Sequence, residues 1–532
     1  MPLNGKSLNI PVNTTDLLHA GLERHPDDLA VVSTASRWSW RELDNATHNL
    51  AANLLQLGLE PGDRVASLMP NRDALLIHYM ACIRTGLIAV PLNYRYMSPE
   101  IDHALEVSDA TVLVAHAERT QDLAMSKLAP SLPQGIIYYE ASNGSTDEFQ
   151  HLLQPVRGAD SLPAHKPDDP AFIFFTSGST GKPKGVTHSH GSLACMFASA
   201  AAAFELTPDD VMLPGSSISH IGGFAFSFAA LMTGARVIVA RTYHDDEVLP
   251  LLRQQRPTVL SMLPAALLHL VRDNGSLRDD FDTLRICRSG ADKVPAELER
   301  EFTELTGLVI DEGYGMTETG LLASNPPSGT IKIGSVGQPI PGVSASIRND
   351  DHVELGSGTA GRLWARTGSA TTGYWNNPAA TEELFRDGWM DTGDLMEADP
   401  DGYLRFRGRK KQIIVHDGSN ISPQEVEEAL LEHSAVDNAA IVGIHDLMHG
   451  ENVRAYVTLK EDAVPPTALE LIRFAHKRIG YKAPEEIEFL DEMPLNATGK
   501  IDRLSLKKLA EERHSISSFR ALDPELSGDS LA

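Results

Sequence analysis

In the first 330 residues, segments with the spacing of apolar positions typical of helices alternate with short apolar runs typical of strands. A helix is predicted to begin at a capping box formed by Ser39 and Glu42, because leucines then recur on one helical face. The short apolar run Arg64–Leu68 predicts a buried strand, and Leu75–Arg84 the next helix. Further strands are predicted at Thr111–Val114, Val211–Leu213, Val237–Ala240, Thr258–Leu260 and Leu284–Ser289. Strands and helices in this order are typical of an α/β fold with largely parallel sheets.

The pattern changes near Ile331, where glycines, turns and short strands become frequent and predict a small β-rich subdomain that ends near Arg407. An α+β pattern follows, with a helix at Ser422–Leu431 and an amphipathic helix at Leu469–Ile479. We therefore expect a large domain at residues 1–408, a small domain at 409–532, and a boundary at Arg409–Lys411. A chain of 532 residues exceeds one ordinary hydrophobic core, which agrees with this division.

The apolar stretch Ile221–Ala240 approaches the length of a membrane span but contains Thr233, Gly234 and Arg236. We expect a buried helix followed by a strand instead, and no membrane span. Met1–Asp16 lacks the basic and apolar regions of a signal peptide. The expectation is a soluble, cytoplasmic protein.

Charge and cysteine content exclude several classes of function. With 46 basic and 72 acidic residues the net charge is −26, which argues against nucleic acid or an anionic membrane as the main partner. An anionic ligand would need a local cluster of N–H groups and cations. The three cysteines, Cys82, Cys195 and Cys287, lie far apart, which favours free thiols over a zinc site or a disulfide framework.

A cluster of N–H groups and cations that could bind an anion is predicted at Thr176–Gly185. This segment follows the apolar strand Ala171–Phe175 and has the sequence TSGSTGKPKG. Its glycines can turn backbone N–H groups toward a ligand, its hydroxyls donate, and its lysines add positive charge, as a polyphosphate requires. The Walker A loop of P-loop NTPases fits poorly, because only two residues instead of four separate Gly178 from Gly181, and Pro183 replaces the hydroxyl that binds Mg²⁺. A Gly/Ser linker is the other alternative, although linkers rarely follow a buried strand.

A second polar segment, Asp311–Glu318, follows a strand predicted at Leu308–Ile310. Ligands bind at such strand ends in open α/β sheets, so Tyr314 could contact a base, Thr317 a phosphate and Glu318 a Mg²⁺ ion. A polar turn without function is the alternative.

Three further segments carry single residues of interest. Asp394 could accept hydrogen bonds from two ribose hydroxyls, and Arg409 could add a ribose or phosphate contact. Lys500 follows a glycine-containing turn near the C-terminus. Taken alone, Asp394 could lie in an ordinary turn and Lys500 could be a solvated surface charge.

The order and spacing of these five segments resemble the adenylate-forming superfamily, which includes acyl- and aryl-CoA ligases, luciferases and the adenylation domains of peptide synthetases. The resemblance extends from about Thr15 to Lys508. It implies a large N-terminal domain of two α/β subdomains and a β-barrel, with a small α+β C-terminal lid. It also implies two half-reactions: a carboxylate attacks the α-phosphate of ATP to give an acyl-adenylate and pyrophosphate, and a thiol, usually coenzyme A, then displaces AMP.

The resemblance assigns catalytic roles to single residues. Lys500 matches a lysine that bridges the acid's carboxylate and the α-phosphate, Thr317 an α-phosphate ligand and Glu318 a magnesium ligand. His220 matches a position beside the reacting carboxylate, for which a buried core histidine is the alternative. Lys411 matches the hinge about which the lid rotates.

Other residues match positions that bind ATP or coenzyme A. Residues of the Thr176–Gly185 loop match the contacts to the β- and γ-phosphates, and Gly418 a glycine that leaves room for the pantetheine arm. The expected cofactor-binding residues are Thr176, Ser177, Gly178, Ser179, Thr180, Gly181, Lys182, Lys184, Gly290, Ala291, Asp311, Glu312, Gly313, Tyr314, Gly315, Asp394, Arg409 and Gly418. The expected cofactors are ATP, Mg²⁺ and coenzyme A. Asp292, Lys293 and Asp417 depart from the common family pattern, which leaves the adenine and coenzyme A contacts near them open.

The acid and its acceptor are only partly determined. Amino-acid-activating relatives carry an aspartate where this chain has Ile221, and a buried ammonium without a counter-charge is costly, which disfavours an α-amino acid. A fatty or aryl acid fits the apolar segment Ile221–Phe228. A dicarboxylic acid substrate stays open as an alternative, because Lys293 could pair with its second carboxylate. Coenzyme A is the favoured acceptor. Transfer to a separate carrier protein, luciferase-like oxygenation and a non-catalytic ATP-binding relative stay open, as does a homodimer.

Overall fold

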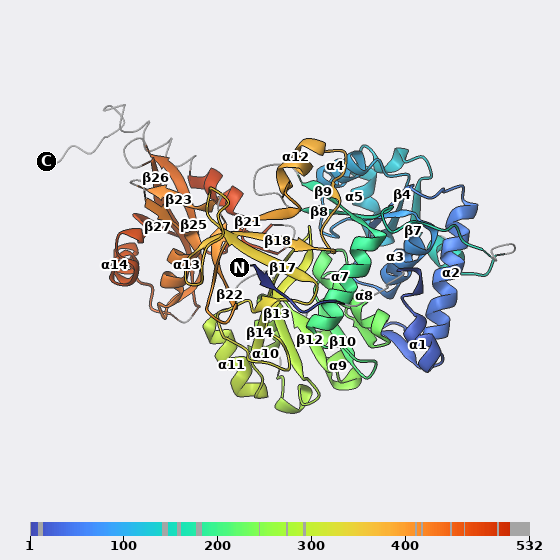
Figure 1. The fold of residues 1–532 in the computed structure, drawn as a ribbon, viewed down its shortest axis with the longest axis horizontal. Coiled ribbons are helices and arrows are strands. Elements are labelled where there is room, and N and C mark those ends of the chain that lie inside the picture. Colours follow the sequence, from blue (N-terminus) through green and yellow to red (C-terminus); the bar gives the residue numbers. More distant parts are fainter. Residues whose placement is uncertain are drawn as a thin grey trace. The chain divides into compact units, whose positions relative to one another are not determined.

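The computed structural model describes residues 2–8, 14–140, 147–156, 161–176, 183–243, 245–272, 275–290, 294–409, 412–416, 419–446, 450–461, 463–496 and 499–510. Its contacts divide the chain into two units (Figure 1). Unit 1 comprises Met1–Thr359, Trp364–Thr392 and Ala398–Arg405, and unit 2 comprises Ala360–Leu363, Gly393–Glu397 and Phe406–Ala532. Residues 410 and 411 lie outside the described residues, so the boundary expected at Arg409–Lys411 stays a prediction.

A seven-stranded sheet in unit 1 has the strand order β19-β9-β8-β5-β4-β6-β7. Its strands β4 to β8 run parallel, whereas β9 is antiparallel to both β8 and β19. The strands are β4 (Arg64–Leu68), β5 (Ile88–Pro91), β6 (Val112–His116), β7 (Ile136–Tyr139), β8 (Pro170–Thr176), β9 (Lys184–Ser189) and β19 (Gly373–Tyr374).

A nine-stranded sheet in unit 1 has the order β16-β15-β14-β13-β12-β10-β11-β2-β3. Strands β2 and β10 to β14 run parallel to one another. At one edge β3 pairs antiparallel with β2, and at the other β15 pairs antiparallel with β14 and β16. The strands are β2 (Leu29–Ser33), β3 (Arg37–Ser39), β10 (Val211–Gly215), β11 (Arg236–Val239), β12 (Val259–Met262), β13 (Ile286–Gly290), β14 (Ile310–Met316), β15 (Gly320–Ser324) and β16 (Gln338–Pro339).

The helices of unit 1 begin and end where local sequence signals place them. Ser39 and Glu42 form the predicted capping box of α2. Gly234 ends α8 in the left-handed conformation, with φ of +80°, and β11 follows, which confirms the predicted helix–strand unit. The longer helices are α2 (Trp40–Gln56), α3 (Asp73–Thr85), α4 (Ser98–Ser108), α7 (His190–Ala203), α8 (Ile221–Thr233), α9 (Asp245–Gln255), α10 (Pro264–Arg272) and α11 (Ala296–Thr306). No helix within the described ranges is long and apolar enough to cross a membrane.

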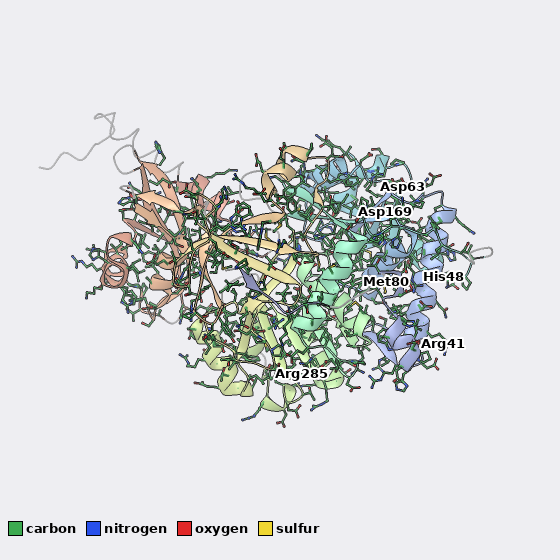
Figure 2. The ribbon with its side chains drawn as sticks, in the orientation of Figure 1. Arg41, His48, Asp63, Met80, Asp169 and Arg285 are labelled. Carbon is green, nitrogen blue, oxygen red and sulfur yellow. The ribbon has the colours of Figure 1, made fainter. Side chains whose placement is uncertain are left out.

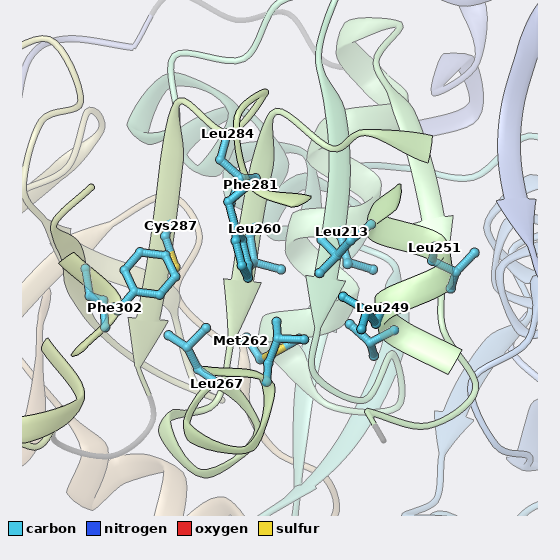
Figure 3. Packing of buried hydrophobic residues seen from close by; sticks show 14 of the residues in the cluster. Leu213, Leu249, Leu251, Leu260, Met262, Leu267, Phe281, Leu284, Cys287 and Phe302 are labelled. Carbon is cyan, nitrogen blue, oxygen red and sulfur yellow. The ribbon is translucent and has the colours of Figure 1, made fainter. Parts of the chain in front are cut away.

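Leucines and phenylalanines bury one face of the nine-stranded sheet (Figure 3). Leu213 of β10 and Leu260 of β12 pack with Leu249 of α9, Leu267 of α10 and Phe302 of α11. On the same sheet Arg285, labelled in Figure 2, donates to both carboxylate oxygens of Asp210 at 2.8 Å. The start of β13 is thereby tied to the start of β10.

The β-rich region forms a six-stranded sheet of order β1-β17-β18-β21-β20, in which β22 also pairs with β21. Residues of β18 and β21 are shared between the two units. Its strands are β1 (Leu3–Asn4), β17 (Val343–Arg348), β18 (Gly361–Thr367), β20 (Phe385–Arg386), β21 (Trp389–Ala398) and β22 (Leu404–Arg409).

Unit 2 adds a five-stranded sheet of order β24-β23-β26-β25, with β27 beside β26. Helices α13 (Pro423–Leu431) and α14 (Ala468–Ile479) pack on it through Val426, Leu430 and Leu471. Its strands are β23 (Ile414–His416), β24 (Ser419–Ile421), β25 (Val436–Asp446), β26 (Gly450–Leu459) and β27 (Glu486–Phe489). The predicted fold class, α/β in the large part and α+β in the small part, is confirmed.

Candidate active site

The predicted phosphate loop connects the antiparallel strands β8 and β9. Thr176 of β8 pairs with Lys184 of β9 at the end of the ladder, and the apolar residues of β8 before Thr176 are buried. Residues 177–182 lie outside the described residues, so the roles expected for Ser177 to Lys182 stay predictions. What the structure contributes is that this segment connects the two strands of one hairpin.

The strand predicted before the second polar segment, Asp311–Glu318, is longer in the structure than in the sequence prediction. The strand expected to end at Ile310 continues as β14 to Met316, and the turn to β15 contains only the three residues 317–319. Glycines explain the length of the strand: a Cβ on Gly315 would lie 2.4 Å from the carbonyl oxygen of Gly320. The close approach of β14 and β15 therefore requires a glycine at a position that the sequence prediction placed beyond the end of the strand.

The backbone of this turn is held by two residues from the seven-stranded sheet and its edge. The imidazole Nε2 of His188, on β9, lies 2.8 Å from the carbonyl oxygen of Thr317. The backbone N–H of Thr371 donates to the carbonyl oxygen of Glu318 at 2.7 Å. The two residues expected to contact phosphate and metal thus have their peptide groups tied to neighbouring elements.

His188 acts in this contact as a neutral donor. Its side chain is fully buried, and burial lowers its pKa from 6.5 to about 4. Because Nε2 faces a carbonyl oxygen, it must carry the proton, and Nδ1 is then left to face the hydroxyl of Ser192 at 3.2 Å.

The carboxylate of Glu318 is buried and joined to β19. The hydroxyl of Tyr374 donates to Glu318 Oε1 at 2.9 Å. On the face of the same ring, Nζ of Lys184 lies 4.8 Å from the ring centroid, which is within the range of a cation–π contact. Burial and the nearby Glu318 charge raise the pKa of Tyr374, so the phenol stays protonated and keeps its donor. Lys184, Tyr374 and Glu318 therefore form a continuous row.

Asp311 is a buried residue of β14. It forms a buried ion pair with Arg288, the residue paired with it on β13, whose Nε lies 2.6 Å from Asp311 Oδ2. The side-chain and backbone N–H groups of Asn325 donate to Asp311 Oδ1 at 2.9 and 3.2 Å. A nucleotide contact from Asp311 would have to use its backbone, because its carboxylate is taken up in this network.

The remaining residues predicted near the nucleotide lie on β13 and β14. Gly290 ends β13 and pairs with Gly313 of β14, where a Cβ on Gly290 would lie 2.9 Å from the Gly313 carbonyl oxygen. Tyr314 is buried, and Glu312 Oε2 accepts from the backbone N–H of Val294 at 3.4 Å. This geometry does not test their role in binding.

His220 immediately precedes α8, in the segment that follows β10. The side-chain amide of Asn93 donates to Nε2 of His220 at 3.3 Å, since the amide oxygen of Asn93 already accepts from the backbone N–H of Arg95. Asn71 supports the same loop by accepting from the backbone N–H of Ile218 at 2.8 Å. Two asparagines thus fix the loop that carries the histidine expected beside the substrate carboxylate.

Unit 2 holds the other predicted residues. Arg409 Nε lies 2.9 Å from Oδ1 of the buried Asp394, so the two residues expected at the ribose lie together. Lys500 is exposed on a tight turn closed by its own backbone N–H to Asn496 Oδ1 at 3.1 Å. Lys411 and Gly418 lie outside the described residues, as does Ala291 of unit 1.

Sequence reasoning missed His188, Asn93 and Tyr374. His188 and Asn93 contact their partners across large sequence separations. Tyr374 could have been suspected from the glycine before it, but its contact with Glu318 depends on β19 pairing with β9. Among the described residues no group of three histidine, cysteine or acidic side chains could hold a metal.

Comparison with known proteins places this geometry in a family. Residues 18–375 match the model of the AMP-binding enzymes, and residues 425–500 match the AMP-binding enzyme C-terminal domain. A feruloyl-CoA synthase of Amycolatopsis is 32% identical over 486 residues, covering 90% of this chain and 94% of that protein. An indoleacetate–CoA ligase of Aromatoleum aromaticum is 32% identical over 510 residues, covering 93% and 97%.

A solved structure agrees with both sequence matches. ATP-bound MatB from Rhodopseudomonas palustris superposes with a TM-score of 0.86 at 28% identity, covering 93% of this chain and 98% of that one. The chain belongs to the family of AMP-binding enzymes, in its acyl-CoA synthetase branch.

Proposed function

We propose that this protein joins a fatty or aryl carboxylic acid to coenzyme A in two steps, through an acyl-adenylate. The observation that carries the proposal is the row formed by Lys184, Tyr374 and Glu318, beside the tied backbone of Thr317. It brings a cation, a hydroxyl and a carboxylate to the point where the phosphate-loop hairpin and the β14–β15 hairpin meet.

In the first step a carboxylate oxygen of the acid forms a bond to the α-phosphorus of ATP. The bond between that phosphorus and the bridging oxygen breaks, and pyrophosphate leaves with the electron pair. Both reactants are anions, so the residues must offset their repulsion and the charge of the transition state. We assign the β- and γ-phosphates to the Thr176–Gly185 loop, the α-phosphate to Thr317 and the ribose to Asp394 with Arg409.

Glu318 fits a magnesium ligand. Mg²⁺ prefers oxygen and is usually held by one or two carboxylates together with substrate phosphates. When bound, the ion would neutralise charge on the phosphate oxygens. The chain's own contribution is a buried carboxylate whose peptide oxygen and side chain are both hydrogen-bonded, by Thr371 and Tyr374.

In the second step the thiolate of coenzyme A attacks the acyl carbon, and the bond from that carbon to the AMP oxygen breaks. We assign Lys500 to the first step, where a cation between two anions is needed, and the Gly418 position to passage of the pantetheine arm. Both assignments rest on the sequence match.

The acid is proposed from the loop and helix that carry His220. Ile221 occupies the first position of α8, so the chain has no acidic side chain there to pair with a substrate ammonium. Asn93 holds the imidazole in one orientation. An apolar acid whose carboxylate is placed near His220 fits these side chains best.

A panel of fatty and aryl acids, read by pyrophosphate release with and without coenzyme A, tests the proposal. We expect acid-dependent release and acyl-CoA among the products. Release of pyrophosphate without any acyl-CoA would reject coenzyme A as the acceptor, and acid-independent ATP hydrolysis would reject the ligase.

The role of Lys500 has a separate test. Lys500→Ala should lower pyrophosphate formation by about 100-fold or more, the usual cost of one electrostatic contact to a transition state, and should spare thioester formation from supplied acyl-AMP. Lys508→Ala, an exposed lysine of the same unit, is the matched control. Equal loss of both half-reactions in Lys500→Ala would contradict the bridging role.

A further inference from the structure

We propose that Tyr374 is a positioning residue for the first half-reaction: its hydroxyl orients the Glu318 carboxylate for the metal, and its ring face orients Lys184 for the phosphates. The inference rests on the proposed function. It concerns a residue that contacts neither the acid nor the reacting phosphorus in the proposal, and that acts through the two residues it touches.

Tyr374 is itself held firmly in place. Its backbone pairs with Val186 on β9, and its N–H donates to Thr381 Oγ1 at 2.9 Å. Gly373 before it has φ of +134°, and a Cβ there would lie 2.4 Å from Thr381 Cγ2. The direction of the ring is therefore set by the sheet edge and by helix α12 (Pro378–Leu384), which carries Thr381.

The segment that carries Tyr374 also links the two hairpins. The backbone N–H groups of Thr372 and Trp375 donate to the carbonyl oxygens of Thr187 and Gly185 on β9, at 2.9 and 2.7 Å. Thr371, in the same segment, donates its N–H to the carbonyl oxygen of Glu318. Residues 371–375 thus fix the backbone of Glu318 and of the strand that begins with Lys184.

The hydroxyl contact limits the rotation of the Glu318 side chain. A glutamate has three rotatable bonds, and ordering it on metal binding costs conformational entropy. A neutral donor at 2.9 Å from Oε1 orders the carboxylate in advance without cancelling its charge. Hydrogen bonds of this kind to a metal-binding carboxylate typically change metal affinity or activity by about 10- to 100-fold.

The ring face acts on Lys184 in a weaker way. The ammonium lies 4.8 Å from the ring centroid, a distance at which the negative face of the ring attracts it. Lys184 is the first residue of β9, near the C-terminal end of the Thr176–Gly185 segment, so this contact fixes a cation at that end. A contact of this strength changes ATP affinity by about two- to fivefold.

Two substitutions separate the two contacts. Tyr374→Phe removes only the hydroxyl and keeps the ring under Lys184, whereas Tyr374→Leu removes both. Tyr139→Phe is the matched control, because Tyr139 is a buried tyrosine of the same sheet whose hydroxyl also bonds a carboxylate, that of Glu140.

The first readout is Mn²⁺ binding to each full-length variant saturated with α,β-methylene-ATP, followed by electron paramagnetic resonance. We expect Tyr374→Phe to weaken Mn²⁺ binding by about 10- to 100-fold and Tyr139→Phe to leave it unchanged. In Glu318→Gln the additional change Tyr374→Phe should have little effect, because the hydroxyl acts through that carboxylate. Wild-type Mn²⁺ affinity in Tyr374→Phe, or independent effects in the double variant, would overturn the inference.

The second readout separates the ring face from the hydroxyl. Tyr374→Leu should weaken binding of the ATP analogue about two- to fivefold beyond Tyr374→Phe, and Lys184→Met should abolish that difference. Equal analogue affinity in Tyr374→Phe and Tyr374→Leu would refute the contact to Lys184.

These measurements can fail independently of the proposed function. If no acid yields pyrophosphate with the wild type, the ligase proposal fails, while a weaker Mn²⁺ complex in Tyr374→Phe still supports the positioning role. If the wild-type protein binds no Mn²⁺ in the presence of the analogue, the positioning role is rejected as well.

Discussion

The two hairpins that carry the candidate chemistry place their polar residues differently. Strand β8 is apolar and buried, and β9 is buried after Lys184 although it carries Thr187 and His188; the polar residues of the predicted phosphate loop lie in the segment between them. In β14 and β15 the polar residues Asp311, Glu312 and Tyr314 lie within the strand, and the connecting turn has only three residues.

Substitutions should separate folding from function more cleanly in the first hairpin than in the second. The described ladder of β8 and β9 ends at the pair of Thr176 and Lys184, and we expect that replacing the polar residues between them affects ligand binding rather than folding. Asp311 is part of a buried network with Arg288 and Asn325, so replacing it should affect folding first. Glu318 lies between these cases, because its side chain is the proposed metal ligand while its backbone is tied to Thr371.

The largest expected effect is on the buried side of β14. Asp311→Ala leaves Arg288 buried without its carboxylate, and we expect the free energy of unfolding to fall by about 3–5 kcal/mol. Denaturant unfolding measures this change. Asp209→Ala is the matched control, because its ion pair with Arg24 is exposed and should contribute at most about 1 kcal/mol. Equal losses in the two variants would show that the Arg288–Asp311 pair does not stabilise the hairpin.

In the phosphate loop we expect a substitution to lower activity and leave stability unchanged. Lys182→Ala should lower the rate of pyrophosphate formation by about 100-fold, or about 2.7 kcal/mol, with an unchanged midpoint of thermal unfolding. Thioester formation from supplied acyl-AMP should stay close to wild type, because pyrophosphate has already left. Lys127→Ala, an exposed lysine of the same unit, controls for loss of surface charge. A lower unfolding midpoint in Lys182→Ala alone would mean that the loop is part of the folded core.

The same contrast explains what could be predicted from the sequence. The capping box at Ser39 and the helix–strand unit within Ile221–Ala240 depend on neighbouring residues, so local patterns were sufficient to predict them. The strand before Thr176 was predicted from its buried apolar run, whereas β9, which begins at Lys184 and pairs back on β8, was not predicted. Local rules succeed where the chain's own neighbours satisfy its polar groups.

Local sequence rules fail where a residue's contact partner is far away in the sequence. The polar residues and glycines at 311–316 led us to end the strand at Ile310, but Arg288 and Asn325 satisfy Asp311, and Gly315 permits close strand pairing, so the strand continues to Met316. Tyr374 reaches Glu318 only through the pairing of β19 with β9. The sequence of residues 311–316, or of the segment around Tyr374, does not by itself predict these contacts.

A smaller effect is expected where the two hairpins meet, at His188. His188→Leu removes the donor to the Thr317 carbonyl and should cost about 2 kcal/mol of stability, together with part of the rate of pyrophosphate formation. His188→Gln offers an N–H group at a similar position and should recover part of both. Unfolding curves and initial rates of the two variants measure this. If Leu and Gln behave alike, the hydrogen bond does not hold the turn.

The smallest effect is a dependence on pH that the same histidine introduces. Burial lowers the pKa of His188 to about 4, below the value of 6.5 that it has when unfolded. As the pH falls through this interval the unfolded chain binds the proton first, so the stability that His188 contributes is lost between pH 6.5 and about 4. At pH 5.5 the loss amounts to about 1.4 kcal/mol relative to neutral pH.

His188→Gln removes this titration while the other buried histidines, His78 and His190, titrate in both proteins and cancel in the comparison. The difference in unfolding free energy between wild type and variant should therefore shift by about 1.4 kcal/mol in favour of the variant between pH 7.5 and pH 5.5. Parallel stability curves over this range would mean that His188 is not buried as a neutral donor. The junction between the hairpins would then be held by Thr371 and Tyr374 alone among the contacts described for that turn.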